Sequence, residues 1–416
     1  MADGLLSPNG PAYSAFIVPV DREITLEAVQ RLQDLAAAGL PIIFTGDTDQ
    51  ARYVSARSGA EADMQAELEA LLSSENVYSV STGGVADQLS SLGLTPRAKP
   101  VTNGTWYTTW TQSEDADFVF IFCDSEDSEG QLIVSTTKQP YAFDPWSGTR
   151  TVILAFEKGV DTTTIPLSLS RNQTMIIGFS DELPPPSRTI ATCDPVPNLL
   201  GSSTSDRTGI LHIARSEDLY EARLSDGESL SVDTRSVADS FELSSWNLVA
   251  ELWEAPEDFN DAATVASKRN ITLDVDTLAS WLDIPELTNA SGVGYYTTNF
   301  TWPPSRGDSD GAYISLAPIN HALMLRVNGE RVPPLNHARP VADISEYLVE
   351  GVNVIEVTVP TMMWNYIRTI ASRIRTSGAP PAPWAMEEST GVPMPGKVEN
   401  GLVGPVAVIP VVSVEI

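Results

Sequence analysis

The stretch Ala322-Leu323-Met324-Leu325-Arg326-Val327-Asn328-Gly329 carries the clearest structural signal in this sequence. A run rich in apolar residues ends in an Asn-Gly pair, which favours the tight turn of a β-hairpin because both residues readily take positive φ angles. Further runs at residues 312–316, 352–359 and 406–414 are apolar or alternate between apolar and polar side chains. This pattern is typical of antiparallel strands with one buried face. The sequence therefore predicts a β-sandwich over residues 246–416.

The region before this sandwich is also rich in short β-runs. They lie at residues 118–122, 131–135, 151–156, 163–169, 175–179, 209–214, 220–224 and 229–232, with turn residues between them. Helical periodicity is missing there, as expected of an antiparallel sandwich. The Pro-rich stretch 183–205 is expected to be a loop or a linker, and the Pro/Gly-rich stretch 376–395 to run over the surface. We therefore predict a first β-sandwich over residues 98–245.

Residues 1–97 have a different sequence pattern, which predicts alternating strands and helices. The apolar run 15–18 is followed by Thr25, a favoured N-cap, then by a helical pattern that ends at Gly39. Residues 40–44, 61–72, 77–78 and 85–92 continue the alternation of strand and helix. This order predicts a parallel sheet with right-handed crossovers. Because parallel strands need cover on both faces, three strands make a thin sheet, and we expect this α/β segment to be incomplete.

Composition and charge exclude several classes of partner. The 416 residues include 25 Lys+Arg and 55 Asp+Glu, which gives a formal net charge of −30. Nucleic acid and anionic membrane surfaces need cationic patches and are therefore not expected as partners. No run approaches the roughly 20 apolar residues of a membrane span. Three His and two Cys offer little for a zinc site, and Thr82-Gly83-Gly84 is too short for a phosphate loop, so neither a metal nor a cofactor is expected. The oligomeric state stays open.

Glycosylation sequons and cysteines indicate the compartment. Asn-X-Ser/Thr sequons occur at Asn103, Asn172, Asn270, Asn289 and Asn299, a modest excess over chance. Together with the acidic composition they predict an extracellular glycoprotein, although residues 1–13 do not form a signal peptide. We expect that signal to have been lost with a missing N-terminal part. Cys123 and Cys193 either form one disulfide or are two buried free thiols.

Three groups of residues carry a resemblance to a known family. They are Ser291-Gly292-Val293-Gly294-Tyr295-Tyr296; Val327-Asn328-Gly329 followed by Asp343-Ile344-Ser345-Glu346-Tyr347-Leu348 and Gly351-Val352-Asn353-Val354-Ile355-Glu356-Val357; and Gly401-Leu402-Val403-Gly404-Pro405-Val406. Together they resemble the sugar-binding-type, galactose-binding-like jelly roll of family 2 glycoside hydrolases. In physical terms, Asp343 can cap the single helical turn before Leu348, and Gly351 permits a tight entry into the next strand.

The whole arrangement, with Pro140-Tyr141-Ala142-Phe143-Asp144-Pro145-Trp146-Ser147-Gly148 in the first sandwich, resembles the C-terminal half of fungal proteins related to the family 106 α-L-rhamnosidases. In these proteins an amidotransferase-like, flavodoxin-like α/β segment precedes β-sandwiches. Their catalytic acid and base lie in an N-terminal (β/α)₈ barrel, which needs roughly 250 residues. Only about 100 residues precede the sandwiches here, so the resemblance assigns no catalytic residue to this chain.

The resemblance implies the non-catalytic C-terminal portion of a secreted, rhamnosidase-like glycoside hydrolase that acts on plant polysaccharide. The expected partner is a carbohydrate or a catalytic barrel domain, and the chain is either a truncated gene model or a shortened paralogue. One alternative is a stand-alone carbohydrate-binding protein. A less favoured alternative is a glycosidase in its own right, with two carboxylates about 5 to 9 Å apart that the sequence cannot select among its acidic residues.

Candidate site residues are mostly aromatic. Flat rings bury the apolar faces of sugars well, so candidates for sugar contacts are Trp106, Trp110, Trp146, Tyr295, Tyr296 and Trp302. The even spacing of Trp106 and Trp110 places both on one face of a strand, which is more typical of a core. His212, His321 and His337 are expected to be structural, since no Ser-His-Asp spacing or Gly-X-Ser-X-Gly elbow accompanies them. The acidic run 124–130 is expected to be a solvated loop, with Ca²⁺ binding as the alternative.

Overall fold

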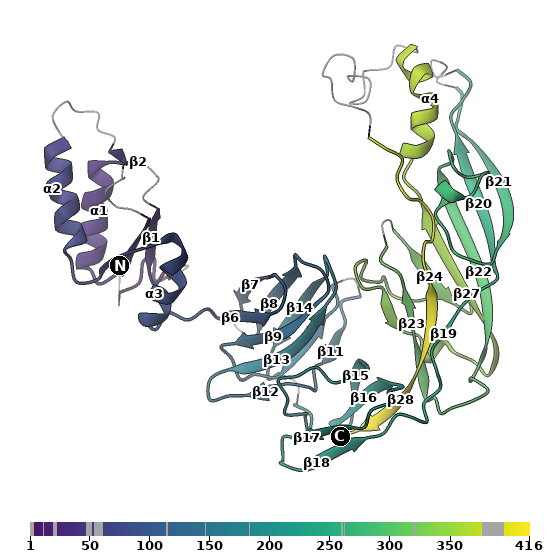
Figure 1. The fold of residues 1–416 in the computed structure, drawn as a ribbon, viewed down its shortest axis with the longest axis horizontal. Coiled ribbons are helices and arrows are strands. Elements are labelled where there is room, and N and C mark those ends of the chain that lie inside the picture. Colours follow the sequence, from purple (N-terminus) through teal and green to yellow (C-terminus); the bar gives the residue numbers. More distant parts are fainter. Residues whose placement is uncertain are drawn as a thin grey trace. The chain divides into compact units, whose positions relative to one another are not determined.

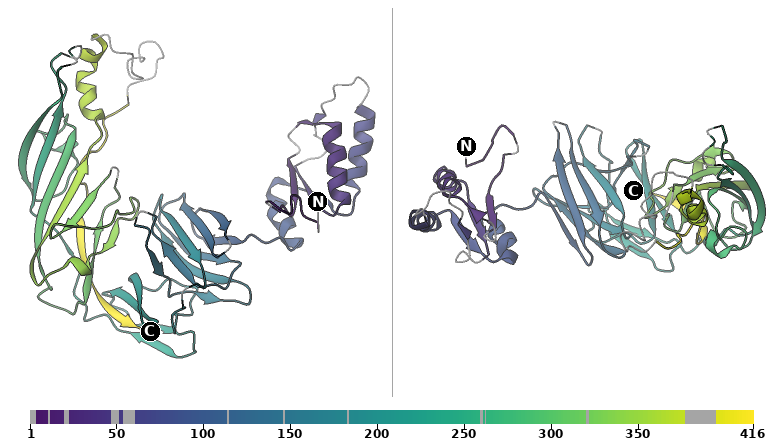
Figure 2. Two further views of the ribbon diagram at one scale, coloured as in Figure 1. Left: turned by 180° about the vertical axis from the view of Figure 1, so that it is seen from behind. Right: turned by 90° about the horizontal axis from the view of Figure 1, so that it is seen from above.

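The computed structural model describes residues 4–10, 12–19, 23–46, 52–53, 61–113, 115–145, 147–182, 184–258, 261, 263–319, 322–376 and 395–416. Two compact units divide the chain, Met1–Pro96 and Arg97–Ile416. The first unit contains helices packed on a small sheet, and the second is built almost entirely of strands (Figure 1 and Figure 2). The predicted combination of an α/β segment with antiparallel β-sandwiches is confirmed.

The first unit has the predicted parallel sheet, in the strand order β1-β3-β5. Its elements are β1 (Phe16–Pro19), β2 (Glu23–Ile24), α1 (Leu26–Ala37), β3 (Ile42–Thr45), β4 (Arg52–Tyr53), α2 (Glu61–Leu72), β5 (Val77–Val80), the 3₁₀ turn η2 (Thr82–Gly84) and α3 (Val85–Ser91). The Thr25 hydroxyl accepts a hydrogen bond from the Ala28 amide at 3.2 Å, as expected of an N-cap. Gly39, with φ of +91°, ends the first helix. Local sequence signals therefore fix this unit well.

The first sandwich consists of a five-stranded and a four-stranded antiparallel sheet. Their orders are β11-β10-β14-β8-β7 and β12-β13-β9-β6. The strands are β6 (Ala98–Thr102), β7 (Trp106–Gln112), β8 (Asp117–Cys123), β9 (Ser128–Val134), β10 (Pro140–Phe143), β11 (Arg150–Val152), β12 (Glu157–Lys158), β13 (Thr163–Leu169) and β14 (Thr174–Phe179). Alternate residues such as Val119, Ile121 and Ile165 are fully buried between the sheets.

The second sandwich packs two six-stranded antiparallel sheets, ordered β15-β16-β28-β23-β26 with β19 paired to β28, and β21-β20-β22-β27-β24-β25. The first contains β15 (Leu199–Ser205), β16 (Thr208–Ala214), β19 (Phe241–Glu242), β23 (Gly311–Leu316), β26 (Val341–Asp343) and β28 (Val406–Glu415). The second contains β20 (Trp246–Glu254), β21 (Ser267–Val275), β22 (Gly292–Trp302), β24 (Met324–Val327), β25 (Glu330–Arg331) and β27 (Gly351–Pro360). The hairpin of β17 (Tyr220–Arg223) and β18 (Ser229–Val232), the turns η3 (Trp281–Asp283) and η4 (Ser345–Tyr347), and helix α4 (Trp364–Thr376) complete the described elements.

The sequence predicts that the strand at residues 209–214 completes the first sandwich and that residues 183–205 form a loop or a linker, and the structure differs on both points. Residues 199–205 form β15, which pairs with β16. Strand β16 also pairs with the last strand of the chain, so that His212 lies opposite Ser413 and Ala214 opposite Val411. The physical reason is long-range pairing, which a local pattern of alternation does not reveal. The second sandwich therefore takes in strands from before residue 246. The Pro/Gly-rich stretch 376–395 lies almost entirely outside the described residues.

The Asn328-Gly329 turn has the predicted form. Both residues have positive φ angles, 53° and 82°, as a type I′ hairpin turn requires. The fully buried Asn353 holds this turn against the start of β27: its Oδ1 accepts from the Val349 amide at 2.9 Å and from Asn328 Nδ2 at 2.8 Å. Its Nδ2 donates to the Val349 and Gly351 carbonyls at 2.7 and 3.1 Å. One buried amide side chain thus connects the Asn328 side chain to the backbone of residues 349–351.

A cluster of buried residues, which we call the joint core, connects the two sandwiches. Its buried members are Tyr141, Val152, Leu154, Ala155, Ile190, Val196, Leu211, Ile213, Leu224, Val232 and Ile416. They come from β10 and β11 of the first sandwich, from β16 of the second, and from the segments between them. The two sandwiches are therefore packed through a shared apolar core. No helix among the described residues is long and apolar enough to cross a membrane.

Replacing Asn353 with alanine should destabilise the second sandwich. The change removes the four hydrogen bonds of a fully buried side chain, so we expect the free energy of unfolding to fall by about 2–4 kcal/mol. Urea unfolding followed by the fluorescence of the buried Trp246 and Trp281 measures this change. Asn247→Ala, at an exposed position of β20, is the control and should stay within about 0.5 kcal/mol of the parent. Equal stability of the two variants would contradict the role given to Asn353.

Candidate functional site

A cavity of about 650 Å³ lies where the two sandwiches meet. Strands β11 and β15 are neighbours in this region (Figure 1). One side of the cavity is lined by β10, β11 and β14, and the other by β15, β16, β23 and β26. A shallower apolar hollow of about 420 Å³ adjoins it and shares Phe120, Phe143 and Asp144 among its lining residues. We call the two together the groove. Its size suits a small ligand with one or a few rings.

Aromatic side chains line the first-sandwich side of the groove. Phe118 and Phe143 pack edge to face with ring centroids 5.5 Å apart, and Phe120 is 43% exposed beside them. These three residues form the aromatic platform. Gly178 makes it possible, because a Cβ at this position would overlap the Phe143 ring and lie 3.2 Å from the Phe118 ring. The glycine at position 178 therefore leaves the space that the Phe118 and Phe143 rings occupy on the surface of the sheet.

Polar side chains from four strands line the opposite side. His212 Nε2 lies 3.3 Å from Ser203 Oγ, and His212 Nδ1 lies 2.9 Å from Tyr313 Oη and 3.4 Å from Asp343 Oδ2. We call Ser203, His212, Tyr313 and Asp343 the polar wall. Gly201 is required next to it, since a Cβ there would overlap the Tyr313 hydroxyl.

The hydrogen bonds of the polar wall define the roles of its groups. His212 connects two hydroxyl groups of the wall, because its Nδ1 lies next to Tyr313 Oη and its Nε2 next to Ser203 Oγ. The carboxylate oxygen Asp343 Oδ1 accepts from the Ser345 hydroxyl at 2.6 Å and from the Ser345 amide at 2.9 Å. Asp343 therefore binds the first amide of the helical turn, as a cap would, but the N-cap position itself is Ile344, whose side chain makes no capping hydrogen bond.

The electrostatics of the polar wall favour an ionised carboxylate. Burial acts to raise the pKa of Asp343, but hydrogen bonds from His212 and Ser345 outweigh it and hold the pKa below its ordinary value. Burial, followed by the negative charge and hydrogen bond of Asp343, raises the pKa of Tyr313. The wall therefore presents a carboxylate and a neutral phenol at neutral pH.

The order of serine, histidine and acid is similar to that of a nucleophilic triad. However, the Tyr313 hydroxyl lies closer to His212 Nδ1 than the Asp343 carboxylate does. Ser203 lies within a β-hairpin, not at the sharp strand-to-helix turn that exposes a nucleophile in α/β-hydrolases. We interpret the polar wall as a fixed set of hydrogen-bonding groups for a ligand.

The groove is held in shape by a loop of the second sandwich. Pro333, Pro334, Leu335 and Asn336 contribute to its lining. Asn336 Nδ2 donates to the Thr174 carbonyl at 3.1 Å, and Arg339 Nη1 donates to the Ser168 carbonyl at 3.2 Å. These two hydrogen bonds connect the loop to strands β14 and β13 of the first sandwich and so fix the width of the groove.

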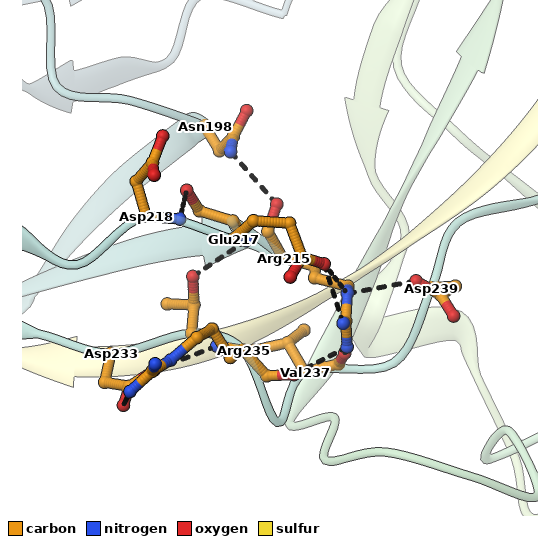
Figure 3. A network of polar contacts seen from close by, with 10 residues as sticks. Asn198, Arg215, Glu217, Asp218, Asp233, Arg235, Val237 and Asp239 are labelled. Carbon is orange, nitrogen blue, oxygen red and sulfur yellow. Dashed lines mark hydrogen bonds and ion pairs between the residues drawn. The ribbon is translucent and has the colours of Figure 1, made fainter.

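A second polar cluster follows β16 and is shown in Figure 3. Arg215 donates to the Arg235 carbonyl at 2.5 Å and to the Glu217 carboxylate at 2.8 Å, and lies 3.1 Å from Asp239. Arg235 pairs with Asp233, and its hydrogen bonds lower the pKa of Asp233 to about 2. Because these charges pair with one another, we interpret the cluster as support for the end of the strand that carries His212.

The aromatic residues proposed from the sequence do not converge on one site. Trp106 is buried and donates to Ser128 Oγ at 2.8 Å, and Trp110 stacks on Phe179 at 6.2 Å. Both belong to the core of the first sandwich, as their even spacing indicated. Trp146 lies outside the described residues.

The remaining aromatic candidates belong to the second sandwich. The Tyr296 hydroxyl is buried and accepts from Trp281 Nε1 at 2.8 Å and from the Leu402 amide at 3.1 Å. Trp302 is half-buried against the same core. Tyr295 is 41% exposed on the outer face of its sheet, so it is accessible but does not line the groove.

Both cysteines are free thiols in the structure, which therefore contains no Cys123–Cys193 disulfide. The buried Cys123 Sγ lies 3.4 Å from Ser128 Oγ, whereas Cys193 Sγ donates to Glu157 at 2.6 Å. Burial, followed by the hydrogen bond and charge of Glu157, raises the pKa of Cys193 to about 11. A thiol with such a pKa is a poor nucleophile at neutral pH.

The other candidate residues have diverse surroundings. Of the histidines, His212 belongs to the polar wall, His337 accepts through its carbonyl from the Ile319 amide, and His321 lies outside the described residues. In the acidic run, Glu126 pairs with Arg171 at 2.8 Å and Asp127 accepts from the Arg171 amide. No group of ligands suited to a metal ion occurs among the described residues.

All five sequon asparagines are exposed. They are Asn103, Asn172, Asn270, Asn289 and Asn299. Their accessibility is compatible with glycosylation, which stays a prediction.

Sequence reasoning missed the groove, although two signals for it exist. Phe143, Asp144 and Pro145 of the motif at residues 140–148 line the groove. A glycine inside a strand pattern, as at Gly178, also indicates that another group approaches the backbone closely.

No protein-family model and no curated protein matches this chain. Among solved structures, the chain is similar to the rhamnosidase from Novosphingobium sp. PP1Y, with a TM-score of 0.57 and 17% identity over 94% of this chain and 33% of that chain. A GH2 beta-galacturonidase from Eisenbergiella tayi matches with a TM-score of 0.26 and 14% identity over 43% of this chain and 25% of that chain. The first match establishes a shared fold. The chain spans about a third of the length of that rhamnosidase.

The lowered pKa of Asp343 predicts a pH-dependent contribution to stability. Above the unfolded pKa of about 3.9 the contribution is fully present, and it is lost as the pH falls through the lower folded pKa. We expect Asp343→Asn to reduce the free energy of unfolding at pH 7 by about 1 kcal/mol, a small value because the side chain is 39% exposed. The difference from the parent should shrink below about pH 4.

Urea unfolding at several pH values between neutrality and acid measures this difference. Asp161→Asn, at an exposed turn position, is the matched control and should have little effect throughout. A difference for Asp343→Asn that stays constant with pH would contradict the proposed network.

Proposed function

We propose that this chain is the non-catalytic portion of a rhamnosidase-like glycoside hydrolase that acts on plant polysaccharide. The observation that carries this proposal is the fold shared over 94% of the chain with one third of a rhamnosidase. The finer assignment, to a fungal protein of the family 106 type with a family 2-type jelly roll, rests on the motifs at residues 140–148, 291–296 and 401–406.

Two features support a non-catalytic role. A (β/α)₈ barrel needs eight parallel strands, and the parallel sheet of the described residues has three longer strands in the order β1-β3-β5. In addition, the acid of a glycosidase needs a raised pKa, whereas the pKa of Asp343 in the groove is lowered and both of its oxygens have partners.

A stand-alone carbohydrate-binding protein is the second candidate. The observation that favours it is the groove, in which rings and fixed polar groups face each other. Both candidates have carbohydrate as the ligand. They differ in whether a catalytic barrel domain is also a partner.

We place the protein outside the cell. The five exposed sequons support this assignment, because glycans are added to accessible asparagines in the secretory pathway. The net charge of −30 adds weak support.

The purified chain should not release p-nitrophenol from p-nitrophenyl α-L-rhamnopyranoside above the buffer blank. The physical reason is that the pKa of Asp343 in the groove is lowered, whereas the catalytic acid of a glycosidase needs a raised pKa. A characterised α-L-rhamnosidase, assayed in parallel, confirms that the assay works. Turnover that copurifies with the chain and is lost in Asp343→Asn would contradict the non-catalytic assignment.

Expression behind a secretory leader in a eukaryotic host should yield a glycoprotein. We expect PNGase F to increase its electrophoretic mobility, because all five sequon asparagines are exposed. Mass spectrometry after deglycosylation in ¹⁸O water locates the modified sites. Asn76, which is followed by Val77-Tyr78 and is therefore not in a sequon, is the internal control. No mobility shift would contradict the extracellular assignment.

A further inference from the structure

We propose that the groove binds neutral sugar residues and rejects uronic acids. The inference rests on the proposed function only in taking carbohydrate as the ligand. It assigns the contact to Phe120 and Phe143 on one side and to the polar wall on the other. Tryptophans of the sandwich cores have no part in it.

The aromatic platform provides the apolar half of the site. The C–H groups on one face of a sugar ring lose less hydration than hydroxyls do, and a flat ring buries them well. Phe120 is 43% exposed, and Phe143 lies next to it in both hollows of the groove. A sugar on this platform would cover apolar surface that water now contacts.

The polar wall provides the directional half of the site. Sugar hydroxyls donate hydrogen bonds, and the Ser203 hydroxyl oxygen in the lining of the groove can accept them. Asp144 adds a carboxylate at the edge shared by the two hollows. Rings on one side and acceptors on the other are the usual composition of a sugar-binding pocket.

Charge determines which sugars fit. The described lining includes the carboxylates of Asp144 and Asp343 and neither lysine nor arginine. A uronate brought there would place a third carboxylate next to two others without a lysine or arginine to pair with it, and this repulsion is a strong basis for rejection. The net charge of −30 further repels acidic polysaccharide at long range.

The site is formed before any ligand arrives. Gly178 and Gly201 leave room for the Phe143 ring and the Tyr313 hydroxyl, and hydrogen bonds fix the imidazole of His212. Asn336 anchors the covering loop to the first sandwich. Little conformational entropy therefore has to be lost on binding, which favours measurable affinity from a small contact area.

Isothermal titration calorimetry and affinity electrophoresis with the purified chain test this proposal. The probes are neutral galactan and arabinogalactan oligosaccharides and methyl α-L-rhamnoside, with oligogalacturonate as the acidic counterpart. We expect binding of at least one neutral probe and none of the oligogalacturonate. The rejection should persist at about 0.5 M NaCl, because salt screens long-range repulsion from the net charge more than contact repulsion inside the groove.

Variants locate the binding site. Phe120→Ala should weaken binding of the neutral probe by about tenfold or more, and Phe120→Trp, which keeps a ring, should retain it. Tyr107→Ala is the matched control: Tyr107 is 58% exposed on the same face of the sheet but does not line the groove. Thermal unfolding of each variant verifies that it is folded.

Three outcomes would overturn the proposal: no binding of any neutral probe, binding of oligogalacturonate at high salt, or equal binding by the parent and Phe120→Ala. The last outcome would leave the proposed function intact and move the carbohydrate contact elsewhere. Conversely, rhamnoside hydrolysis by the parent chain would refute the non-catalytic assignment without touching the groove.

Discussion

The pairing of the last strand of the chain with two strands that precede it by one to two hundred residues is the constraint on which the second unit depends. Strand β28 lies between β16 and β23 and completes their sheet. On one face of this strand Val406 and Val408 fill the core of the second sandwich, while farther along the chain Ile416 enters the joint core. The strand therefore stabilises both cores at once, and without it His212 and Tyr313 would not belong to one sheet.

The groove follows from this arrangement and from the absence of side chains at two positions. Where the edges of two sheets meet, side chains normally fill the corner, because interiors pack at high density. Here Gly178 and Gly201 leave space that the Phe143 ring and the Tyr313 hydroxyl occupy. The consequence is a corner whose two walls differ in chemistry, since the aromatic wall comes from the first sandwich and the polar wall from the second.

Local sequence signals predict much of this fold. The N-cap at Thr25, the alternation of the strands and the Asn328-Gly329 turn are each set by a few neighbouring residues, and the structure confirms them. The assignment of residues 209–214 to the first sandwich was wrong, because strand pairing between distant segments leaves no local trace. The candidate site could not be predicted for the same reason: Ser203, Tyr313 and Asp343 meet only after four separate strand pairings have formed.

The aromatic candidates show why residue type alone is a weak guide to a sugar site. Trp106 and Tyr296 are large and amphipathic, and in both the polar atom is satisfied inside a core by Ser128 or Trp281. A ring whose polar atom is already hydrogen-bonded and whose faces are buried in a core offers neither exposed surface nor a hydrogen-bonding group to a ligand. Phe120 is the opposite case, since it offers a bare apolar face at an open position. Exposure next to fixed acceptors, and not aromatic character, is therefore the property that distinguishes a binding ring from a core ring in this protein.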